Sequence, residues 1–285
     1  MTLQRRPQIR PADKRSYQRT NGRHIRQELK DESGTVVTFV GHATACIEMD
    51  GETLITDPLL RDRLLHLRRE VPCAADDCLP VDELSAVVVS HLHLDHADLS
   101  SLRRIPAQVP LIAPQGTGGY LRARLPHPVH TIKMWESFQV GSVEVIAVPA
   151  AHSGPGPSAS PFSTCAGFVM RGSSTTYFAG DTALFAEMAD LGAEFDIDLA
   201  LLPVWGYGPT LRGDHMTPRD AAHALTMLRP RMAVPIHWGT FRPLGKLWSR
   251  LSYFSDPPYT FAGYAAYLAP DTEVRILQPG DAVSF

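Results

Sequence analysis

The sequence predicts an α/β fold in which polar side chains gather where β-strands end. Short runs rich in β-branched residues, such as 86–89, alternate with segments that carry helix-start signals, such as Thr217-Pro218. Several apolar runs lead directly into polar clusters, and in open α/β sheets ligands bind where strands end. The chain has 285 residues, 44% hydrophobic and 20% charged, which is enough to bury a sizeable core.

The first 34 residues are predicted to form a basic arm that precedes one domain over 35–285. Residues 1–30 hold nine Lys or Arg against two acidic residues, while the whole chain has a net charge of −3. The arm lacks apolar periodicity apart from a short helical pattern near 21–30, which favours a solvated extension. Attraction of the arm to nucleic acid or to an anionic membrane is the alternative.

The domain is expected to open with three strands, at 36–40, 45–49 and 53–56, with a hairpin turn at Asp50-Gly51. A long connection over 59–80 follows, with leucines and arginines interleaved at 64–69. This part is predicted to be a surface loop with inward-pointing leucines, and a short amphipathic helix is the alternative.

The stretch after the apolar run 86–89 carries the clearest chemistry. Residues two apart in extended backbone point the same way, so His91 and His93 share one side while Leu92 and Leu94 face the other. Asp95 and His96 follow where the chain must turn. Three imidazoles and a carboxylate within six residues suit a divalent metal of the zinc type.

The rest of the chain alternates in the same manner. Helices are expected at 98–104, 119–124 and 182–191, and a further one begins with Thr217 as N-cap, Pro218 at the first position and Asp220 completing a capping box. The expected strands are 111–113, two within 131–150, the hairpin 167–171 with 175–179, then 199–202, 233–236 and 273–277. Loops at 153–161 and 203–209 are rich in glycine and proline and are expected to shape a pocket.

His-x-His-x-Asp-His after a hydrophobic strand is the signature of the metallo-β-lactamase superfamily, and residues 91–96 resemble it at every motif position. His152, Asp181 and His237 each follow a predicted strand and resemble the remaining ligand motifs, in the expected order. The resemblance runs from about Thr35 to near the C-terminus. It implies a four-layer αββα sandwich with two mixed sheets.

The resemblance also implies a centre with two divalent ions about 3.5–4 Å apart that share a water or hydroxide. His91, His93 and His152 would hold one ion, Asp95, His96 and His237 the other, and Asp181 would bridge them. Five imidazoles and two carboxylates favour zinc, with manganese or iron as alternatives.

Three further residues are expected around this centre. Asp57 matches the superfamily's structural aspartate, which supports metal-binding histidines. His42 lies in a Gly-His-Ala-Thr turn and is either a residue near the metals or substrate, or a hydrogen-bonded turn histidine. His215 precedes the helix start at Thr217 and resembles an active-site histidine of the branch with sugar-acid-phosphate lactonases and N-acyl-phosphatidylethanolamine phospholipase D. With Asp95 it is assigned to catalysis, as acid/base or transition-state stabiliser.

The implied function is a metal-dependent hydrolase in which a metal-bridging hydroxide cleaves a phosphodiester or cyclic ester of a small or phospholipid-like molecule. A nuclease of the tRNA-processing type is the first alternative, but outside the arm the chain is acidic, which disfavours nucleic acid as partner. A non-catalytic scaffold is the second, but the complete ligand set argues against it. A homo-oligomer is compatible with the sequence.

Location is expected to be cytoplasmic. No run approaches the roughly 18 apolar residues of a membrane span, and no secretory signal is visible, which also disfavours a true β-lactamase. The four cysteines, Cys46, Cys73, Cys78 and Cys165, show no disulfide framework.

Overall fold

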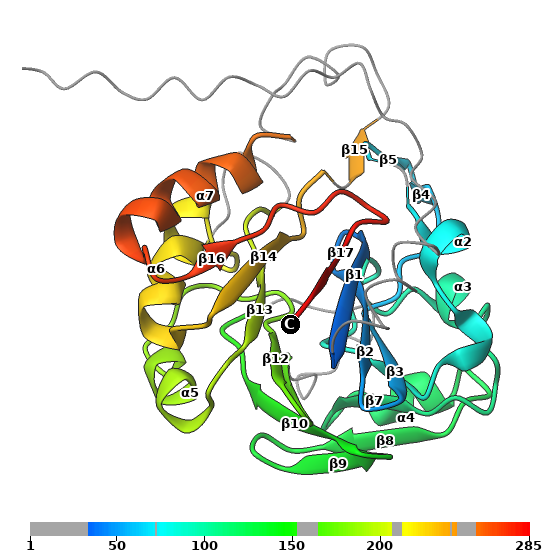
Figure 1. Cartoon of the computed structure of the whole chain (residues 1–285). Coiled ribbons are helices and arrows are strands. Elements are labelled where there is room, and N and C mark those ends of the chain that lie inside the picture. The colour runs from blue at the N-terminus through cyan, green and yellow to red at the C-terminus, as the bar shows by residue number, and fades with distance from the viewer. Residues whose placement is uncertain (1–33, 72, 153–164, 207–212, 240, 244–254) are drawn as a thin grey trace, which may run out of the picture.

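Two large mixed sheets pack face to face in the computed structural model, as the predicted fold class requires (Figure 1). The structure describes residues 34–71, 73–152, 165–206, 213–239, 241–243 and 255–285. The predicted helix near 21–30, the loop 153–161 and residues 207–209 of the loop 203–209 lie outside these ranges, and the division into arm and domain stays a prediction.

The first sheet has seven strands in the order β17-β1-β2-β3-β6-β7-β8. Their bounds are β1 (Thr35–Gly41), β2 (Thr44–Met49), β3 (Glu52–Thr56), β6 (Ala86–Val88), β7 (Leu111–Pro114), β8 (Val129–Ile132) and β17 (Ala282–Ser284). The second sheet has the order β16-β14-β13-β12-β11-β10-β9. Its strands are β9 (Ser137–Val140), β10 (Val143–Pro149), β11 (Ala166–Arg171), β12 (Thr175–Phe178), β13 (Leu199–Pro203), β14 (Met232–Ile236) and β16 (Glu273–Val274).

Both sheets follow one pairing pattern: three antiparallel pairs, then three parallel pairs. In this pattern β1 corresponds to β10, β3 to β12 and β6 to β13. The carboxyl ends of the parallel strands of one sheet lie at one edge, so loops after corresponding strands can meet between the sheets.

Helices cover the outer faces of the two sheets. In Figure 1, α5 (Met188–Glu194), α6 (Pro218–Leu228) and α7 (Pro257–Leu268) lie over the second sheet. On the outer face of the first sheet lie α2 (Ala75–Cys78), α3 (Leu99–Leu102) and α4 (Gly118–Arg122). One apolar core lies between the sheets and beneath α5–α7, and a second lies between the first sheet and α2–α4. Strands covered on both faces read as near-continuous apolar runs, which is why 36–40 and 86–89 were recognisable.

Most elements agree with the sequence predictions. The three opening strands, the turn at Asp50 and Gly51 with φ of 52° and 84°, the hairpin β11–β12 and strand β13 are confirmed. The helices at 98–104 and 119–124 exist with shifted ends. The helix start at Thr217 has the expected capping box with Asp220.

The segment 64–69 is neither a helix nor a loop. It forms a hairpin of β4 (Arg63–Leu64) and β5 (Leu67–Arg69), which pairs with β15 (Phe241–Pro243) in a third, three-stranded sheet. Leu64 and Leu67 are cross-strand partners that pack on Leu59 and Phe241. The pairing partner is about 170 residues away in sequence, so local patterning cannot reveal it.

Three other predictions were wrong in part. The stretch 131–150 holds the end of a third strand, β8, which belongs to the first sheet, and only β9 and β10 meet at Gly141. The helix expected at 182–191 begins at Met188, because the preceding segment is held by loop contacts: Ala183 N–H donates to Ala151 O, and Met216 N–H donates to Thr182 O. The strand expected at 273–277 ends at Val274.

In the described part of the chain, no helix combines the length and apolarity needed to cross a bilayer. All four cysteines are free thiols.

Candidate metal centre

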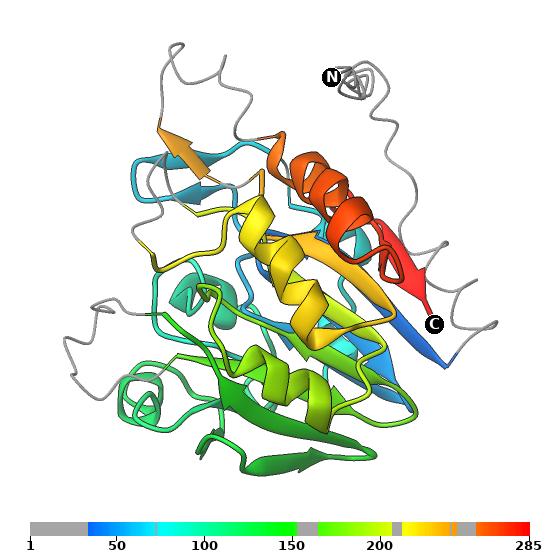
Figure 2. The ribbon, with the colours of Figure 1, turned by 90° about the vertical axis from the view of Figure 1, so that its left-hand side faces the viewer.

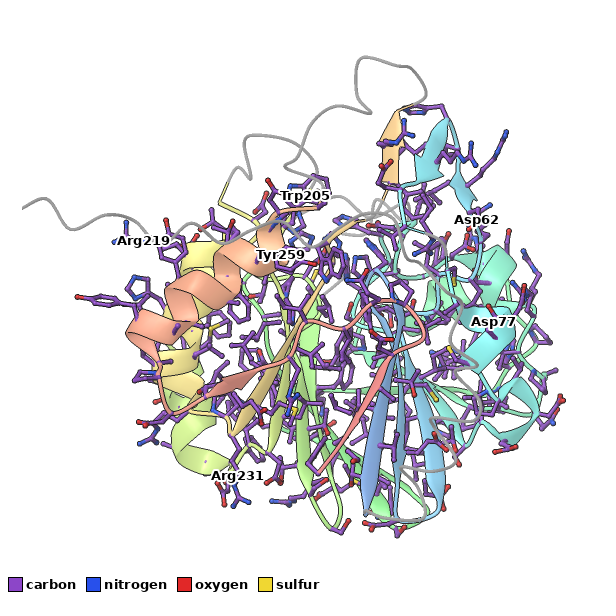
Figure 3. All side chains as sticks on the ribbon, turned by 45° about the horizontal axis from the view of Figure 1, so that its top comes forward. Asp62, Asp77, Trp205, Arg219, Arg231 and Tyr259 are labelled. Carbon is purple, nitrogen blue, oxygen red and sulfur yellow. The ribbon has the colours of Figure 1, made fainter. Side chains whose placement is uncertain are left out.

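The histidines and aspartates singled out in the sequence converge where loops of the two sheets meet. His42 follows β1, the stretch 91–96 follows β6, His152 follows β10, Asp181 follows β12 and His237 follows β14. Figure 3 turns this end of the molecule toward the viewer and labels Trp205, which follows β13 there. In the shared pairing pattern, His42 and His152 follow corresponding strands, as do Asp57 and Asp181.

The loop after β6 folds back immediately. The backbone N–H groups of His96 and Ala97 both donate to His93 O, at 3.1 and 2.8 Å, so Asp95 and His96 turn toward the same centre as the earlier histidines. Asp98 then caps α3 by accepting from Ser101 N–H at 3.0 Å. A tight turn between a buried strand and a capped helix therefore fixes the motif.

A first donor set consists of His91, His93, His152 and Asp181. One ligand atom from each lies within 4.8 Å of all the others. The Nε2 atom of His152 is 3.2 Å from His93 Nδ1, and His91 Nε2 is 4.0 Å from Asp181 Oδ2. This arrangement could hold one metal ion.

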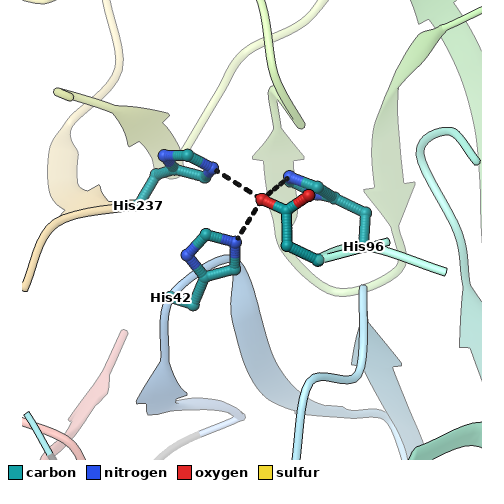
Figure 4. A group of neighbouring side chains, drawn as sticks. His42, His96 and His237 are labelled. Carbon is teal, nitrogen blue, oxygen red and sulfur yellow. Dashed lines mark hydrogen bonds and ion pairs between the residues drawn. The ribbon is translucent and has the colours of Figure 1, made fainter. Parts of the chain in front are cut away.

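A second set consists of His42, Asp95, His96 and His237, again within 4.8 Å. The Oδ2 atom of Asp95 lies 3.1 Å from His42 Nε2, 3.5 Å from His96 Nε2 and 3.7 Å from His237 Nε2 (Figure 4). Asp181 reaches this set too, at 3.0 Å from His96 Nε2 and 3.2 Å from His237 Nε2. Its carboxylate therefore lies between the two donor sets.

Oxygen acceptors behind the rings hold them in place. Asp57 accepts from Ser90 N–H at 2.7 Å and from Ser90 Oγ–H at 2.5 Å, and its Oδ2 faces His96 Nδ1 at 2.6 Å. The rings of His237 and His152 point Nδ1 at backbone carbonyls, at 2.7 Å from Trp205 O and 2.8 Å from Asp214 O. An Nδ1–H donated in this way leaves the Nε2 lone pair free for a cation.

The backbone around the centre is strained. His42, Asp57 and His237 have φ of 61°, 33° and 64°, in the left-handed region that non-glycine residues avoid. Such conformations cost about 1–3 kcal/mol each and persist where the surroundings enforce them, often at active sites. Here each strained residue directly follows a strand and aims its side chain at the cluster.

Burial and mutual charge set the protonation states. Burial disfavours the charged form of His96, but Asp181, Asp95 and Asp57 together raise its pKa well above the ordinary value. The pKa of His237 is also raised, by Asp181 and Asp95 against burial.

Four other side chains of the cluster have lowered pKa values. Burial lowers the pKa of His91 well below its usual value and that of His42 to about 3. Although burial alone would raise them, the carboxyl pKa values of Asp95 and Asp181 lie well below normal because of the surrounding imidazoles. Two ionised carboxylates therefore lie among the histidines of the centre.

These residues fit a divalent cation of the zinc type. The donors are imidazoles and carboxylates, which such ions prefer. The Nε2 atom of His91 is buried, points into the cluster and makes no hydrogen bond to any described residue, although burying such an atom without a partner is costly. Asp57 with His91 and His96 forms a third close group, but the hydrogen bonds of Asp57 to Ser90 and His96 explain it.

His215 lies beside both donor sets. Its Nδ1 is 3.7 Å from Asp181 Oδ2, and its ring centroid is 4.9 Å from that of His152 and 5.7 Å from that of His237. Its side chain is 16% exposed, so one side remains accessible. A Cβ atom at Gly206 would lie 2.8 Å from His215 Cγ, so the close approach of this loop requires glycine.

The structure thus brings together every residue named from the sequence for this centre. Sequence reasoning missed Ser90, which links Asp57 to His91 through its hydroxyl, 2.9 Å from His91 Nδ1. It also missed the carbonyls of Trp205 and Asp214, which carry no sequence signal because every residue has one. A hydroxyl directly before the first motif histidine was the available clue for Ser90.

This chain is similar to a known family and to several known proteins. Residues 52–238 match the family model described as Beta-lactamase superfamily domain. An uncharacterized protein of Mycobacterium tuberculosis is 32% identical over 248 residues, which cover 80% of this chain and 66% of that protein, just under two thirds. A UPF0173 metal-dependent hydrolase of Rubrobacter xylanophilus is 29% identical, with 87% of this chain and 96% of that protein covered.

Two further proteins are similar to this chain. N-acyl-phosphatidylethanolamine-hydrolyzing phospholipase D 1 of Caenorhabditis elegans is 29% identical, with 87% of this chain and 75% of that protein covered. The solved structure of Igni18, a metallo hydrolase from Ignicoccus hospitalis, superposes with a TM-score of 0.66 at 23% identity and covers 88% of this chain and 98% of that one. The structural likeness shows the shared fold.

Proposed function

The chain belongs to the metallo-β-lactamase superfamily, and on that premise we propose that it is a dinuclear metal-dependent hydrolase of ester bonds. The observation that carries this proposal is the position of the Asp181 carboxylate between two compact donor sets. Neither set contains a serine or cysteine nucleophile. The nearby thiol of Cys165 is no alternative, because burial raises its pKa to about 12.

Each ion has its own ligands in this proposal. His91, His93 and His152 hold one cation, Asp95, His96 and His237 hold the other, and Asp181 serves both. Zinc is favoured by the donor types. When bound, such a pair supplies Lewis-acid polarisation of the scissile group and activates water at neutral pH.

The protein's own groups orient these ligands and stabilise charge. Asp57 fixes the ring of His96, and the carbonyls of Trp205 and Asp214 fix those of His237 and His152. Burial lowers the pKa of His215 to about 4 despite Asp181, so its ring is neutral at pH 7. A neutral ring favours donation of a hydrogen bond to developing negative charge on the substrate over storage of a proton.

His42 is proposed to orient Asp95 and not to bind metal. A ligating histidine donates its second N–H to an oxygen, as His237 and His152 can. The Nδ1 of His42 is buried and has no hydrogen-bond partner in the described part of the chain, so a proton there would be unsatisfied. A proton on Nε2 instead donates to Asp95 Oδ2 at 3.1 Å.

His42→Ala is therefore expected to keep the fold and to weaken binding of one of the two cations by about 10–100-fold, the usual effect of removing a residue that orients a ligand. His42→Gln, which retains an N–H donor, should recover part of this affinity. Competition with a chromogenic chelator measures both variants. Affinity equal to that of the unmodified protein in His42→Ala would remove the orienting role.

Metal affinity is expected to rise with pH. The raised pKa values of His96 and His237 mean that these rings keep a second proton to higher pH than an ordinary histidine, and a cation must displace any such proton. As the pH rises through those pKa values, displacing the protons costs less free energy, and the cation binds more tightly. Calorimetry in buffers of different protonation enthalpy between about pH 6 and pH 8 should show proton release and tightening affinity. A pH-independent affinity without proton release would contradict these protonation states.

The proposed bond is a phosphodiester, and a cyclic ester is the second candidate. The similarity to a phospholipase D supports the first. The test is hydrolysis of bis(p-nitrophenyl) phosphate and of a lactone panel by metal-loaded protein, with Asp95→Ala as blank. Chelator-sensitive cleavage of the phosphodiester supports the proposal, and cleavage of lactones alone replaces it with a lactonase. No turnover of either substrate class by fully loaded protein would reject both.

A further inference from the structure

The three-stranded sheet β15-β5-β4 projects from the body of the molecule at the end where the donor sets lie (Figures 1 and 2). Its inner face is apolar and anchored: Leu64 and Leu67 pack on Leu59 and Phe241. The ring of Phe241 also meets that of His42 edge-on, with centroids 6.1 Å apart. The small sheet is thus fixed directly to the candidate metal centre.

The outer face of this sheet carries a row of arginines. Arg68 pairs in register with Arg63 on one side and with Arg242 on the other. Directly opposed residues of antiparallel strands point to the same face, and neighbouring strands lie about 4.8 Å apart. Arg63 and Arg68 are exposed, and Arg242 is half-buried and ion-paired with Glu70. Alternation agrees, because Leu67 and Arg69 on either side of Arg68 face inward.

Such a row is unfavourable for the sheet itself. Like charges placed directly opposite one another destabilise a strand pair. Glu70 offsets Arg242, and Asp62, adjacent to Arg63 in the sequence, is the other acid of the hairpin segment. Arg63 and Arg68 remain adjacent cations without a carboxylate within ion-pair distance among the described residues. Guanidinium groups bind phosphate oxygens through paired N–H donors, so a phosphate-bearing surface complements this row.

The turn at the tip of the same hairpin has unusual residues. Its two turn residues are Leu65 and His66, where hairpins favour asparagine and glycine. Leu65 has a φ of 52° and is 74% exposed, the largest exposure of a leucine in the described chain. A bulky apolar side chain is thus held out into solvent, in a strained conformation, beside exposed cations.

We propose that this hairpin face, formed by Arg63, Leu65, Arg68 and Arg242, docks the protein on an anionic phospholipid surface. The arginines meet lipid phosphates while Leu65 enters the boundary between head groups and acyl chains. An apolar tip beside the cations favours a lipid surface over a nucleic acid, which offers phosphates but no apolar layer. The inference deepens the proposed function, because it would bring the metal centre to phosphodiesters at a membrane surface.

Vesicle co-sedimentation of the full chain tests the proposal. The protein should bind vesicles that contain phosphatidylglycerol and not vesicles of phosphatidylcholine alone. Arg63→Glu/Arg68→Glu should lower the partition coefficient about tenfold or more, since each basic residue near an anionic surface adds severalfold affinity. Arg122→Glu/Arg124→Glu is the matched control, with the same charge change at two exposed arginines of and just after α4, and should bind better than the hairpin variant. Because the basic arm is present in every variant, it cancels from the comparison.

Leu65→Asn separates the apolar contribution, because asparagine tolerates the left-handed conformation. It should weaken binding without changing its salt dependence. Arg63→Gln/Arg68→Gln replaces the charge reversal if that variant unfolds. Equal loss in the hairpin and control variants, or binding of an oligonucleotide but not of vesicles, would overturn the proposal. Turnover of soluble bis(p-nitrophenyl) phosphate by the hairpin variant should be unchanged, so failure of docking and failure of hydrolysis are separable.

Discussion

Replacement of Asp95 or His237 by alanine is expected to remove one of two bound cations and to lower hydrolysis by about 10³-fold or more. Both residues belong to the second donor set, and Asp95 Oδ2 lies within 3.7 Å of three imidazole nitrogens there. A catalytic cation contributes several kcal/mol to the transition state, and 1.36 kcal/mol corresponds to a factor of ten. The first donor set stays intact, so one cation should remain.

Elemental analysis and turnover of bis(p-nitrophenyl) phosphate measure the two parts of this prediction. His66→Ala is the control, since His66 is an exposed histidine of the hairpin tip and belongs to neither donor set. It should retain the full metal content and turnover. Undiminished metal in both Asp95→Ala and His237→Ala would show that the second donor set does not bind an ion.

His215→Ala is expected to lower kcat by roughly 10²-fold or more while leaving the metal content unchanged. The ring lies beside Asp181 and both donor sets but is not a member of either. Its proposed task is to donate a hydrogen bond as charge develops on the substrate, so kcat should fall more than KM rises. His215→Gln, which keeps an N–H donor, should recover part of the rate.

His223→Ala is the matched control, a partly exposed histidine on α6 outside both donor sets. An unchanged kcat in His215→Ala, at full metal content, would remove the catalytic role. Loss of metal in this variant would instead make His215 a ligand, contrary to its assignment.

Local sequence patterns predict most of the helices and strands. The turn at Asp50-Gly51 and the capping box at Thr217 depend on a few adjacent residues, and both were readable from the sequence. The hairpin at 63–69 was not, because its third strand lies about 170 residues away and its leucines find their core only in the folded chain. The late start of α5 at Met188 has a similar cause, since contacts of Ala183 with Ala151 hold the preceding turn.

Some residues of the candidate metal centre could be predicted from the sequence, and others could not. Its histidines and aspartates were identifiable because each follows a strand, and strand ends meet at one edge of the fold. The carbonyl groups of Trp205 and Asp214 that face His237 and His152 could not be identified, because every residue has a backbone carbonyl. The turn motif left the role of His42 open, and its contact with Asp95 and its partnerless Nδ1 among the described residues support the proposal that it orients Asp95.

Two donor sets that share Asp181 are expected to bind two cations. Metal content per chain, measured by elemental analysis after chelator treatment, reloading with zinc and removal of excess metal, tests it most directly. We expect about two zinc ions per chain, and about one in Asp95→Ala. A protein that holds a single ion, or none, after reloading would contradict it.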